Sequence, residues 1–397
     1  MPLLSLSHIR RTSERIAGYL HATPLIPSRS LSDLSGAQVF LKLENLQKTG
    51  SFKVRGAFAK LTSIASPRVA AASMGNHGQA VAFAARALGK QATVVMPETA
   101  AIVKQEATKG YGAEVVLAGG SFDEALVHAL SLKDAAFIHP FDDDEVIAGQ
   151  ASIGIEVCSD LKDIDAVLVP VGGGGLIAGV AAAVKALSPT TTVIGVQSSS
   201  ATSACRSFRE KQVCSQTPAH TIADGIAVGQ VGTRTLEYLR AYVDDMLTVD
   251  EDAIARAILL FLERKKLVVE GAGAVPLAAL LEHAERFRGK RVALIVSGGN
   301  IDFTLVDRII LKGLITSGRI GVLQVVLDDV AGSLHRITGL IASQQANILH
   351  VSHDRTAADI PIAKARVLFT MEVRGKEHFD ELIAFLRSGG YDVRLGS

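Results

Sequence analysis

Strand-forming and helix-forming segments alternate along most of this chain. Short apolar runs are each followed by a segment, often rich in alanine, with the periodicity of a helix. The first series has strands at 69–72, 92–96, 114–117 and 136–139 and helices at 77–88, 100–111 and 121–132. The second has helix 146–158, strand 166–171, helix 176–187, strand 192–197, helix 251–265 and strand 292–296. The alternation predicts two lobes, each built on a parallel sheet, with a ligand cleft between them.

The composition fits a globular protein without a highly charged partner. The 397 residues are 48% hydrophobic and 20% charged, and the formal net charge is +1. Such a chain is long enough for two or three domains, and its balanced charge disfavours a nucleic-acid partner. No apolar run reaches membrane-spanning length and no leader pattern is present, so we predict a cytoplasmic protein with no membrane partner. Cys158, Cys205 and Cys214 show no paired metal-ligand spacing, which favours packing roles, a reducing compartment and no metal site.

Lys53 stands where a predicted strand gives way to a helix. The strand-forming run 38–43 is followed by residues 49–51, Thr-Gly-Ser, which supply turn and N-cap chemistry, so we expect the helix to begin there. The positive helix end and the cations Lys48 or Arg55 would disfavour an ammonium charge on Lys53. Schiff-base chemistry with pyridoxal phosphate requires such a nucleophilic lysine. The alternative is an ordinary solvated lysine on a helix surface.

A run of four glycines marks a second candidate site. Gly172, Gly173, Gly174 and Gly175 join the strand 166–171 to the helix 176–187. Bare backbone N–H groups at the positive end of a helix bind phosphate closely. The loose dinucleotide fingerprint also fits this loop, but the next strand ends in Gln197, where ribose recognition needs an acidic residue. We therefore favour a phosphate other than that of NAD.

Two further turns lie at the ends of predicted strands. In the turn 73–79, the Ser73 hydroxyl and the Asn76 amide can hold a carboxylate at a helix N-terminus, and Asn76 can instead bind a cofactor phenolic oxygen. His77 is either part of this site or a structural histidine. In the turn 297–300, the Ser297 hydroxyl is expected to face the cleft, where it can bind a ring nitrogen.

Short motifs over nearly the whole chain carry a family resemblance. They are GSFKVRGA at 50–57, SMGNHG at 73–78, MPE at 96–98, YGAE at 111–114, HPFD at 139–142, GGGGL at 172–176, DGIAV at 224–228, VEGAGA at 269–274 and SGGN at 297–300. In this order and spacing they resemble the threonine dehydratases, or threonine ammonia-lyases, of the tryptophan-synthase-β-like class of pyridoxal phosphate enzymes. The implied fold is the two-lobed parallel-sheet α/β fold known as fold type II.

The resemblance also implies roles for individual residues. Lys53 would bond covalently to the cofactor, and Lys53 and Ser73 would be catalytic. The implied cofactor contacts are Phe52 on the ring, Asn76 on the 3′-oxygen, Gly172 to Gly175 with Leu176 on the phosphate, Glu270, and Ser297 at the pyridine nitrogen. The implied substrate contacts are Ser73, Asn76 and His77. The implied reaction is β-elimination from L-threonine, and from L-serine, to a 2-oxo acid (2-oxobutanoate or pyruvate) and ammonia.

Two sequence differences from related serine racemases bear on the predicted reaction and on the predicted metal requirement. Those enzymes resemble this chain but carry a serine acid/base at the position of Met74, and a thioether cannot transfer a proton. They also bind a divalent cation with carboxylates near a stretch where this chain has Gln197 and Ser203. We therefore expect neither efficient racemisation nor a magnesium requirement of the racemase kind.

The pattern changes from about residue 318. Strand 320–327, helix 334–343, strands 348–353 and 365–372, helix 376–388 and strand 393–395 give the order βαββαβ of a ferredoxin-like sandwich. With Asp328, Gly332 and Asn347, this segment resembles an ACT domain, a module that binds amino acids at the turn after its first strand, usually across a pair of modules. The resemblance implies isoleucine or valine as effector and a homodimer or homotetramer. A purely structural dimerisation domain is the alternative.

The sequence thus predicts a catalytic domain over residues 1–317, with a smaller lobe at about 48–145 inserted in the larger one, and an ACT regulatory domain over 318–397. Two other functions compete with a regulated dehydratase. One is a racemase, or a dehydratase for another β-hydroxy amino acid such as serine or 3-hydroxyaspartate. The other is a non-catalytic amino-acid sensor, which is disfavoured because Lys53 and the glycine run are both present.

Overall fold

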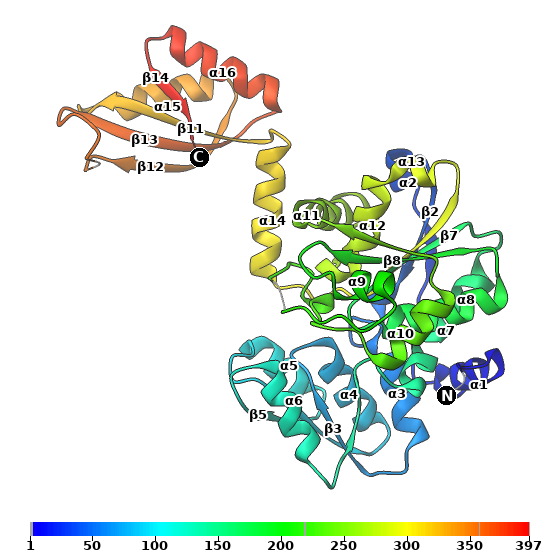
Figure 1. The fold of residues 1–397 in the computed structure, drawn as a ribbon. Helices are drawn as coiled ribbons and strands as arrows, with labels where there is room; N and C mark the ends of the chain where they lie inside the picture. The colour runs from blue at the N-terminus through cyan, green and yellow to red at the C-terminus, as the bar shows by residue number, and fades with distance from the viewer. Residues whose placement is uncertain (1–2, 218–219, 357, 397) are drawn as a thin grey trace. The chain divides into compact units, whose positions relative to one another are not determined.

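The computed structural model describes residues 3–217, 220–356 and 358–396. They form two compact units, Met1–Asp302 and Phe303–Ser397 (Figure 1). This division lies earlier than the expected one after residue 317, because helix α14, Phe303–Thr316, belongs to the second unit. The turn that ends α14 packs closely there: a Cβ on Gly318, whose φ is +71°, would lie 2.8 Å from the Lys376 nitrogen.

The larger lobe of the first unit is built on a six-stranded sheet. Its order is β1 (Leu25–Pro27), β2 (Gln38–Leu43), β10 (Arg291–Val296), β7 (Ala166–Pro170), β8 (Thr192–Ser198) and β9 (Asp245–Val249). Every neighbouring pair is parallel except β1 and β2. Every residue of β7 is buried, which explains why its sequence is a continuous apolar run rather than an alternating one.

The smaller lobe is a four-stranded parallel sheet between β2 and β7 in the sequence. Its order is β5 (Glu114–Leu117), β4 (Gln91–Met96), β3 (Arg68–Ala72) and β6 (Ala136–Phe137). Its helices are α3 (Lys53–Ser63), α4 (Asn76–Ala87), α5 (Ile102–Gly110) and α6 (Phe122–Ser131). The prediction of two parallel-sheet lobes is confirmed.

The other helices of the first unit are α1 (Leu6–Ala17), α2 (Arg29–Ser35), α7 (Asp144–Asp160), α8 (Gly175–Leu187), α9 (Ser203–Glu210), α10 (Thr233–Tyr242), α11 (Glu251–Leu260), α12 (Gly271–Glu282) and α13 (Ala284–Phe287). The predicted helix 251–265 is interrupted, because its last turn, Phe261–Lys265, is a π-helix. Two short 3₁₀ turns, Glu44–Leu46 and Asp224–Ile226, complete the unit.

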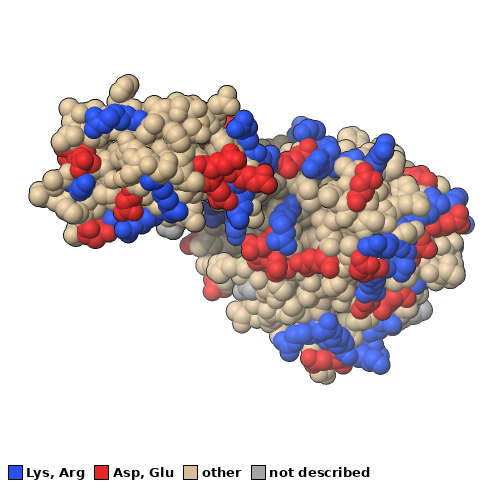
Figure 2. Space-filling model, turned by 90° about the horizontal axis from the view of Figure 1, so that it is seen from above, with Lys and Arg blue, Asp and Glu red and all other residues tan. Residues whose placement is uncertain are grey.

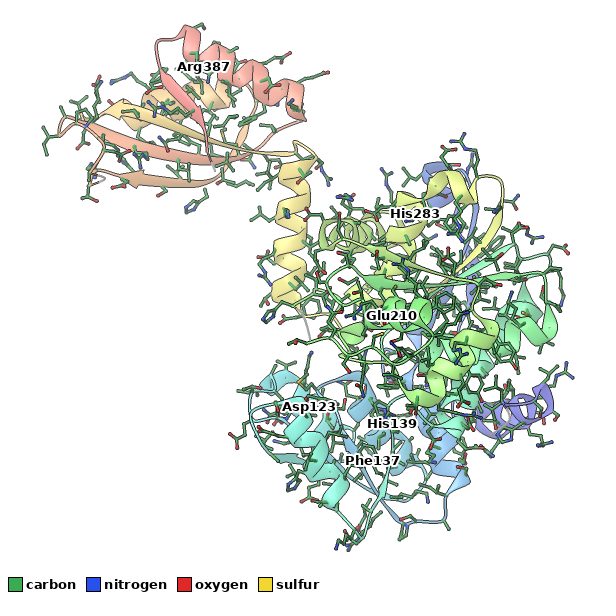
Figure 3. The ribbon with its side chains drawn as sticks, viewed as in Figure 1. Asp123, Phe137, His139, Glu210, His283 and Arg387 are labelled. Carbon is green, nitrogen blue, oxygen red and sulfur yellow. The ribbon has the colours of Figure 1, made fainter. Side chains whose placement is uncertain are left out.

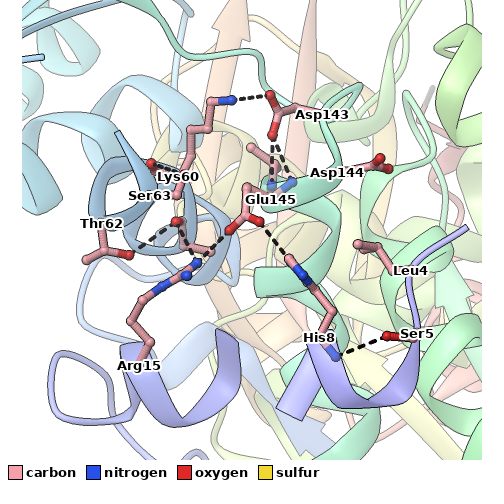
Figure 4. A network of polar contacts seen from close by, with 12 residues as sticks. Leu4, Ser5, His8, Arg15, Lys60, Thr62, Ser63, Asp143, Asp144 and Glu145 are labelled. Atoms are coloured by element: carbon pink, nitrogen blue, oxygen red, sulfur yellow. Dashed lines mark hydrogen bonds and ion pairs between the residues drawn. The ribbon is translucent and has the colours of Figure 1, made fainter. Parts of the chain in front are cut away.

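Charged contacts join α1, α3 and α7 (Figure 4). Asp143 accepts hydrogen bonds from the first N–H groups of α7 and pairs with Lys60 of α3 at 2.5 Å. Glu145 pairs with His8 and Arg15 of α1 at 2.8 and 2.5 Å. The start of α7 therefore holds the lysine-bearing helix α3 against the N-terminal helix.

A buried ionic cluster fixes α3 from its other side. The Arg55 guanidinium donates to both carboxylate oxygens of Glu44, each at 2.8 Å, and to Glu156 at 2.5 Å. The Lys42 amine lies 2.5 Å from Glu156. Arg55, Lys42 and Glu44 are each at most 1% exposed, so α3 is tied to β2 and α7 through charges removed from water.

The second unit contains an antiparallel sheet in the order β12 (Asn347–Asp354), β13 (Lys364–Glu372), β11 (Ile320–Asp328) and β14 (Asp392–Leu395). With α15 (Ser333–Ser343) and α16 (Lys376–Ser388), its element order after α14 is βαββαβ, as the sequence predicts. The core consists of apolar residues that alternate along β11 and β13, together with one face of each helix.

Neither the surface charge shown in Figure 2 nor the helix lengths indicate a particular class of partner. Acidic and basic side chains lie interspersed on the face shown in Figure 2. Over residues 3–217, 220–356 and 358–396, every helix is too short or too polar to cross a membrane. The three cysteines are free, with Cys205 and Cys214 buried.

Candidate active site

Lys53 occupies the first turn of α3, as predicted, but the helix begins differently. Phe52 precedes it in helical conformation, and no side chain caps the helix. Ser51 was expected to contribute to the cap; instead it pairs with Gly298 in an isolated β-bridge, so the helix starts two residues later. The Lys53 amine donates to the Pro140 carbonyl at 2.9 Å and lies 5.3 Å from the centre of the Phe52 ring.

Burial makes the Lys53 amine a better nucleophile than an ordinary lysine. Loss of solvation lowers the pKa of Lys53 to about 8, while the charge of Glu270 acts in the opposite direction. The expected contribution of neighbouring cations is not found, because the Arg55 guanidinium is bound by Glu44 and Glu156 in the ionic cluster. The predicted direction was right, but its cause is desolvation.

Asn76 of the smaller lobe and Glu270 of the larger lobe are in direct contact. Asn76 begins α4, and its Nδ2 lies 3.0 Å from both oxygens of Glu270, which immediately precedes α12. Burial raises the pKa of Glu270 to about 7; the Asn76 hydrogen bond opposes this shift and the charge of Asp224 adds to it. The site therefore contains a carboxyl group that titrates near neutral pH.

Ser73 and His77 lie at the two sides of the turn after β3. The Ser73 side chain is buried, and its hydroxyl accepts a hydrogen bond from the Gly75 N–H at 3.1 Å. His77 Nε2 lies 2.9 Å from the Ile138 carbonyl, so this nitrogen carries a proton and donates it. Burial, together with the charge of Lys53, lowers the pKa of His77 to about 3. The His77 side chain is therefore neutral, and its Nε2 has a structural role because it binds the Ile138 carbonyl.

The glycine run forms the turn between β7 and α8, as predicted. Gly174 has a φ of +97°, a backbone conformation that residues with a side chain rarely adopt. A Cβ on Gly173 would lie 2.3 Å from the Phe141 ring, and one on Gly175 would lie 2.8 Å from the Phe141 Cβ. The Thr235 hydroxyl donates to the Gly173 carbonyl at 2.8 Å. Packing thus holds this backbone without side chains, so that N–H groups at the start of α8 and Leu176 remain available to a phosphate.

Ser297 follows β10 and adjoins the Lys53 turn. It is 2% exposed, and its carbonyl accepts a hydrogen bond from the Phe52 N–H at 3.0 Å. A Cβ on the next residue, Gly298, would lie 2.3 Å from Glu270 Oε1. The structure therefore gathers Lys53, Glu270 and Ser297 at the carboxyl ends of strands, where ligands bind in open α/β sheets.

Several residues of the site were not assigned a role from the sequence. Two of them lie in the motif HPFD: Pro140 accepts the Lys53 hydrogen bond through its carbonyl, and Phe141 packs against Gly173 and Gly175. The His139 ring stacks edge-on against Phe137 at 6.1 Å between centroids; both are labelled in Figure 3. Lys104 of α5 pairs at 2.9 Å with Asp224 of the larger lobe. No local pattern in the sequence predicts such contacts between distant segments.

The candidate regulatory residues do not form one cluster within the second unit. Asp328 ends β11, where Lys364 of β13 pairs with it at 2.6 Å, and Gly332 precedes α15 with a φ of +86°. Asn347 begins β12 beside Glu372, which is the partner of Ile320 at the opposite end of β11. Asp328 and Gly332 therefore share a turn that Asn347 of the same unit does not join.

The described residues contain no group of three or more histidine, cysteine, aspartate or glutamate side chains that could hold a metal ion. Gln197 Oε1 instead accepts the Cys205 N–H at 2.9 Å, and the Ser203 hydroxyl donates to the Val228 carbonyl at 2.8 Å. Both residues thus have partners within the protein.

Comparison with known proteins gives a consistent result. A family model described as pyridoxal-phosphate dependent enzyme matches residues 16–298. An L-threonine ammonia-lyase of Thermotoga maritima is 44% identical over 400 residues, covering 99% of this chain and 100% of that protein. One of Geobacter sulfurreducens is also 44% identical, covering 98% and 99%. Among solved structures, a threonine deaminase from T.th. is 46% identical with a TM-score of 0.73, covering 76% of this chain and 99% of that chain. Maize serine racemase is 32% identical with a TM-score of 0.74, covering 79% and 99%.

Proposed function

The chain belongs to the pyridoxal-phosphate dependent enzyme family, and from this premise we propose that it deaminates L-threonine to 2-oxobutanoate and ammonia. The observation that carries the proposal is Lys53, a buried lysine with a lowered pKa. Its amine binds the Pro140 carbonyl, and the next residue, Phe141, packs against the glycine run that would hold a phosphate. The names and high identity of the ammonia-lyases that match nearly the whole chain support L-threonine as substrate.

The residues present fit pyridoxal phosphate. The backbone from Gly172 to Gly175 would hold its phosphate, Phe52 would pack on its ring, and Ser297 would face the ring nitrogen. The bound cofactor supplies an electron-withdrawing ring that acidifies the α-proton of an amino acid. Asn76 and Glu270 would border its phenolic oxygen, because their side chains meet at 3.0 Å and the charge of Glu270 acts on the Lys53 amine.

The protein's own groups can then carry the proton transfers. The neutral Lys53 amine accepts the α-proton of the substrate, and the buried surroundings keep bulk water from competing. The Ser73 hydroxyl and the N–H groups at the start of α4 hold the substrate carboxylate. Met74, at the position where related racemases have a serine, offers no proton, so the residue type at this position favours loss of the β-hydroxyl over racemisation.

The experiment that tests this function is a product assay. Protein loaded with pyridoxal phosphate should release 2-oxobutanoate and ammonia in equal amounts from L-threonine, and pyruvate from L-serine. A protein that binds the cofactor but releases an oxo acid from neither would contradict the proposal. Formation of D-serine, or deamination of 3-hydroxyaspartate alone, would favour the alternative substrates and reactions.

Uptake of the cofactor should depend on pH in a defined way. Only a neutral amine attacks an aldehyde, and the neutral fraction of Lys53 grows as pH rises through its pKa of about 8. The rate at which the apoprotein takes up pyridoxal phosphate is therefore expected to rise up to about pH 8 and then to level off. Absorbance of the bound cofactor measures this rate. A rate that still climbs about tenfold from pH 8 to pH 9, as expected for an ordinary lysine, would contradict the lowered pKa.

We propose further that residues 318–397 form an ACT domain that binds isoleucine or valine at the turn containing Asp328 and Gly332. The βαββαβ order and the left-handed conformation of Gly332 support it. The cytoplasmic location and the homodimer or homotetramer remain predictions.

Addition of L-isoleucine or L-valine is expected to change the L-threonine concentration for half-maximal rate by about 5-fold or more. Gly332→Val should abolish this response without loss of basal activity, because valine strains a φ of +86° in the turn. Gly339→Ala in α15, where the added methyl group meets open space, is the control and should keep the response. An identical response in both variants would place the effector elsewhere.

A further inference from the structure

Asn300 touches three separate parts of the site. Its Nδ2 donates to Asn76 Oδ1 at 2.7 Å and to the Thr49 carbonyl at 2.9 Å, in the turn before Lys53. Gly50, with a φ of +72°, has no room for a side chain, because a Cβ there would lie 2.3 Å from Asn300 Oδ1. The Asn300 backbone also faces the Glu270 carboxylate and acts to lower its pKa. Neither the cofactor contacts nor the proton transfers described above involve this residue.

These contacts fix which way round the Asn76 amide lies. The oxygen and nitrogen of an amide have nearly the same shape, so their partners decide the orientation. The Thr49 carbonyl can only accept, which turns Asn300 Nδ2 toward it. The same nitrogen can only donate, which turns Asn76 Oδ1 toward Asn300 and leaves Asn76 Nδ2 facing Glu270. The Thr49 carbonyl therefore sets the orientation of the Asn300 side-chain amide, which in turn sets the orientation of the Asn76 amide.

We propose that Asn300 is a positioning residue that holds Asn76 with its Nδ2 donor turned toward Glu270 and the cofactor's phenolic oxygen. The inference rests on the proposed function for the identity of the cofactor. A phenolate oxygen needs a donor, and a reversed amide would present an oxygen lone pair to both the phenolate and the Glu270 carboxylate. Asn300 itself needs no contact with the substrate or with pyridoxal phosphate for this effect.

Asn300→Asp tests the proposal, because aspartate keeps the shape but has no side-chain N–H. The Asn76 amide is then expected to turn its nitrogen toward residue 300 and its oxygen toward Glu270. The dissociation constant for pyridoxal phosphate should rise about 10-fold or more. The midpoint pH at which the cofactor's absorbance band changes should rise. The phenolic oxygen and the Glu270 carboxylate would both lose the Asn76 donor, and each would then hold a proton more tightly. Asn300→Ala, which adds no charge, should change both quantities in the same direction by less.

Asn45→Asp is the matched control. Asn45 adjoins the same loop, since a Cβ on Gly299 would lie 3.2 Å from its Cβ, but its Nδ2 donates to the Val268 carbonyl at 3.1 Å. This variant should keep the wild-type dissociation constant and titration. The unfolding temperature of each apoprotein shows whether it has folded, and Asn300→Ala replaces Asn300→Asp if the latter has not.

The proposal is overturned if Asn300→Asp or, where that variant does not fold, Asn300→Ala binds and titrates as the wild type does, or if Asn45→Asp changes both quantities equally. Neither readout needs turnover. A protein that binds pyridoxal phosphate but does not deaminate L-threonine would therefore refute the proposed function and leave this test intact, whereas a protein that binds no pyridoxal phosphate would overturn both.

Discussion

Lys53→Ala is expected to lower the rate of L-threonine deamination by about 10³-fold or more, because one amine both attaches the cofactor and accepts the α-proton. In the structure this amine lies in the first turn of α3, bonded to the Pro140 carbonyl at 2.9 Å. Alanine is a better helix former than lysine, so α3 itself should persist. The measurement is 2-oxobutanoate release, together with the absorbance band of covalently bound pyridoxal phosphate, which should be lost from the variant.

Lys60→Ala is the matched control for this prediction. Lys60 lies in the same helix, two turns further on, and pairs with Asp143 at 2.5 Å with both side chains partly exposed. Its removal should cost at most about 1 kcal/mol of stability and leave the absorbance band in place. If Lys53→Ala kept both the band and the activity, another group would have to be the nucleophile and the assignment of the site would be wrong.

Glu44→Ala should have the largest effect on stability, destabilising the protein by about 3–5 kcal/mol, because it leaves a buried guanidinium without its main partner. Glu44 is 0% exposed and accepts two hydrogen bonds of 2.8 Å from Arg55, which is itself 1% exposed. The remaining carboxylate, on Glu156, is shared with Lys42. Urea unfolding of the apoprotein, followed by circular dichroism, measures the change.

Glu106→Ala provides the comparison for Glu44→Ala. The Glu106 carboxylate pairs with Lys109 at 2.8 Å, but about half or more of each side chain is exposed. Removing such a surface pair should change the free energy of unfolding by no more than about 1 kcal/mol. Equal losses in the two variants would show that water penetrates the cluster around Arg55 and that its charges are not effectively buried.

The parts of the fold that the sequence predicts correctly are those with a local periodic signal. The strand and helix boundaries of the smaller lobe agree within about two residues at each end, because each segment is short, regular and bounded by turn residues. The glycine run likewise sits between β7 and α8, since only glycine tolerates the packing of Phe141 against that backbone.

Helix α12 shows what the sequence conceals. It begins Gly-Ala-Gly-Ala-Val-Pro and contains Pro276, so neither propensity nor amphipathic spacing identifies it as a helix. Its first ten residues are all buried, which removes the alternation of polar and apolar faces on which the prediction depends. Its position matters, because Glu270 stands at its N-terminus.

The electrostatics of the site were also only partly predictable. The lowered pKa of Lys53 arises from burial beneath segments such as that of Pro140, 87 residues away in sequence, rather than from the neighbouring cations that the local sequence suggests. The raised pKa of Glu270 and the contacts of Asn300 depend in the same way on long-range packing. Local sequence identifies the reactive residue types, and tertiary structure sets their protonation.

The strand order of the larger sheet has a consequence for the newly synthesised chain. β2 lies between β1 and β10, so its parallel partner, Arg291–Val296, leaves the ribosome about 250 residues after it. The smaller lobe, in contrast, has all of its strands between Arg68 and Phe137 and can assemble while synthesis continues. The nascent protein must therefore hold β2 unpaired on one edge until the last strand of its sheet arrives. In that interval this edge is open to aggregation and to binding by chaperones.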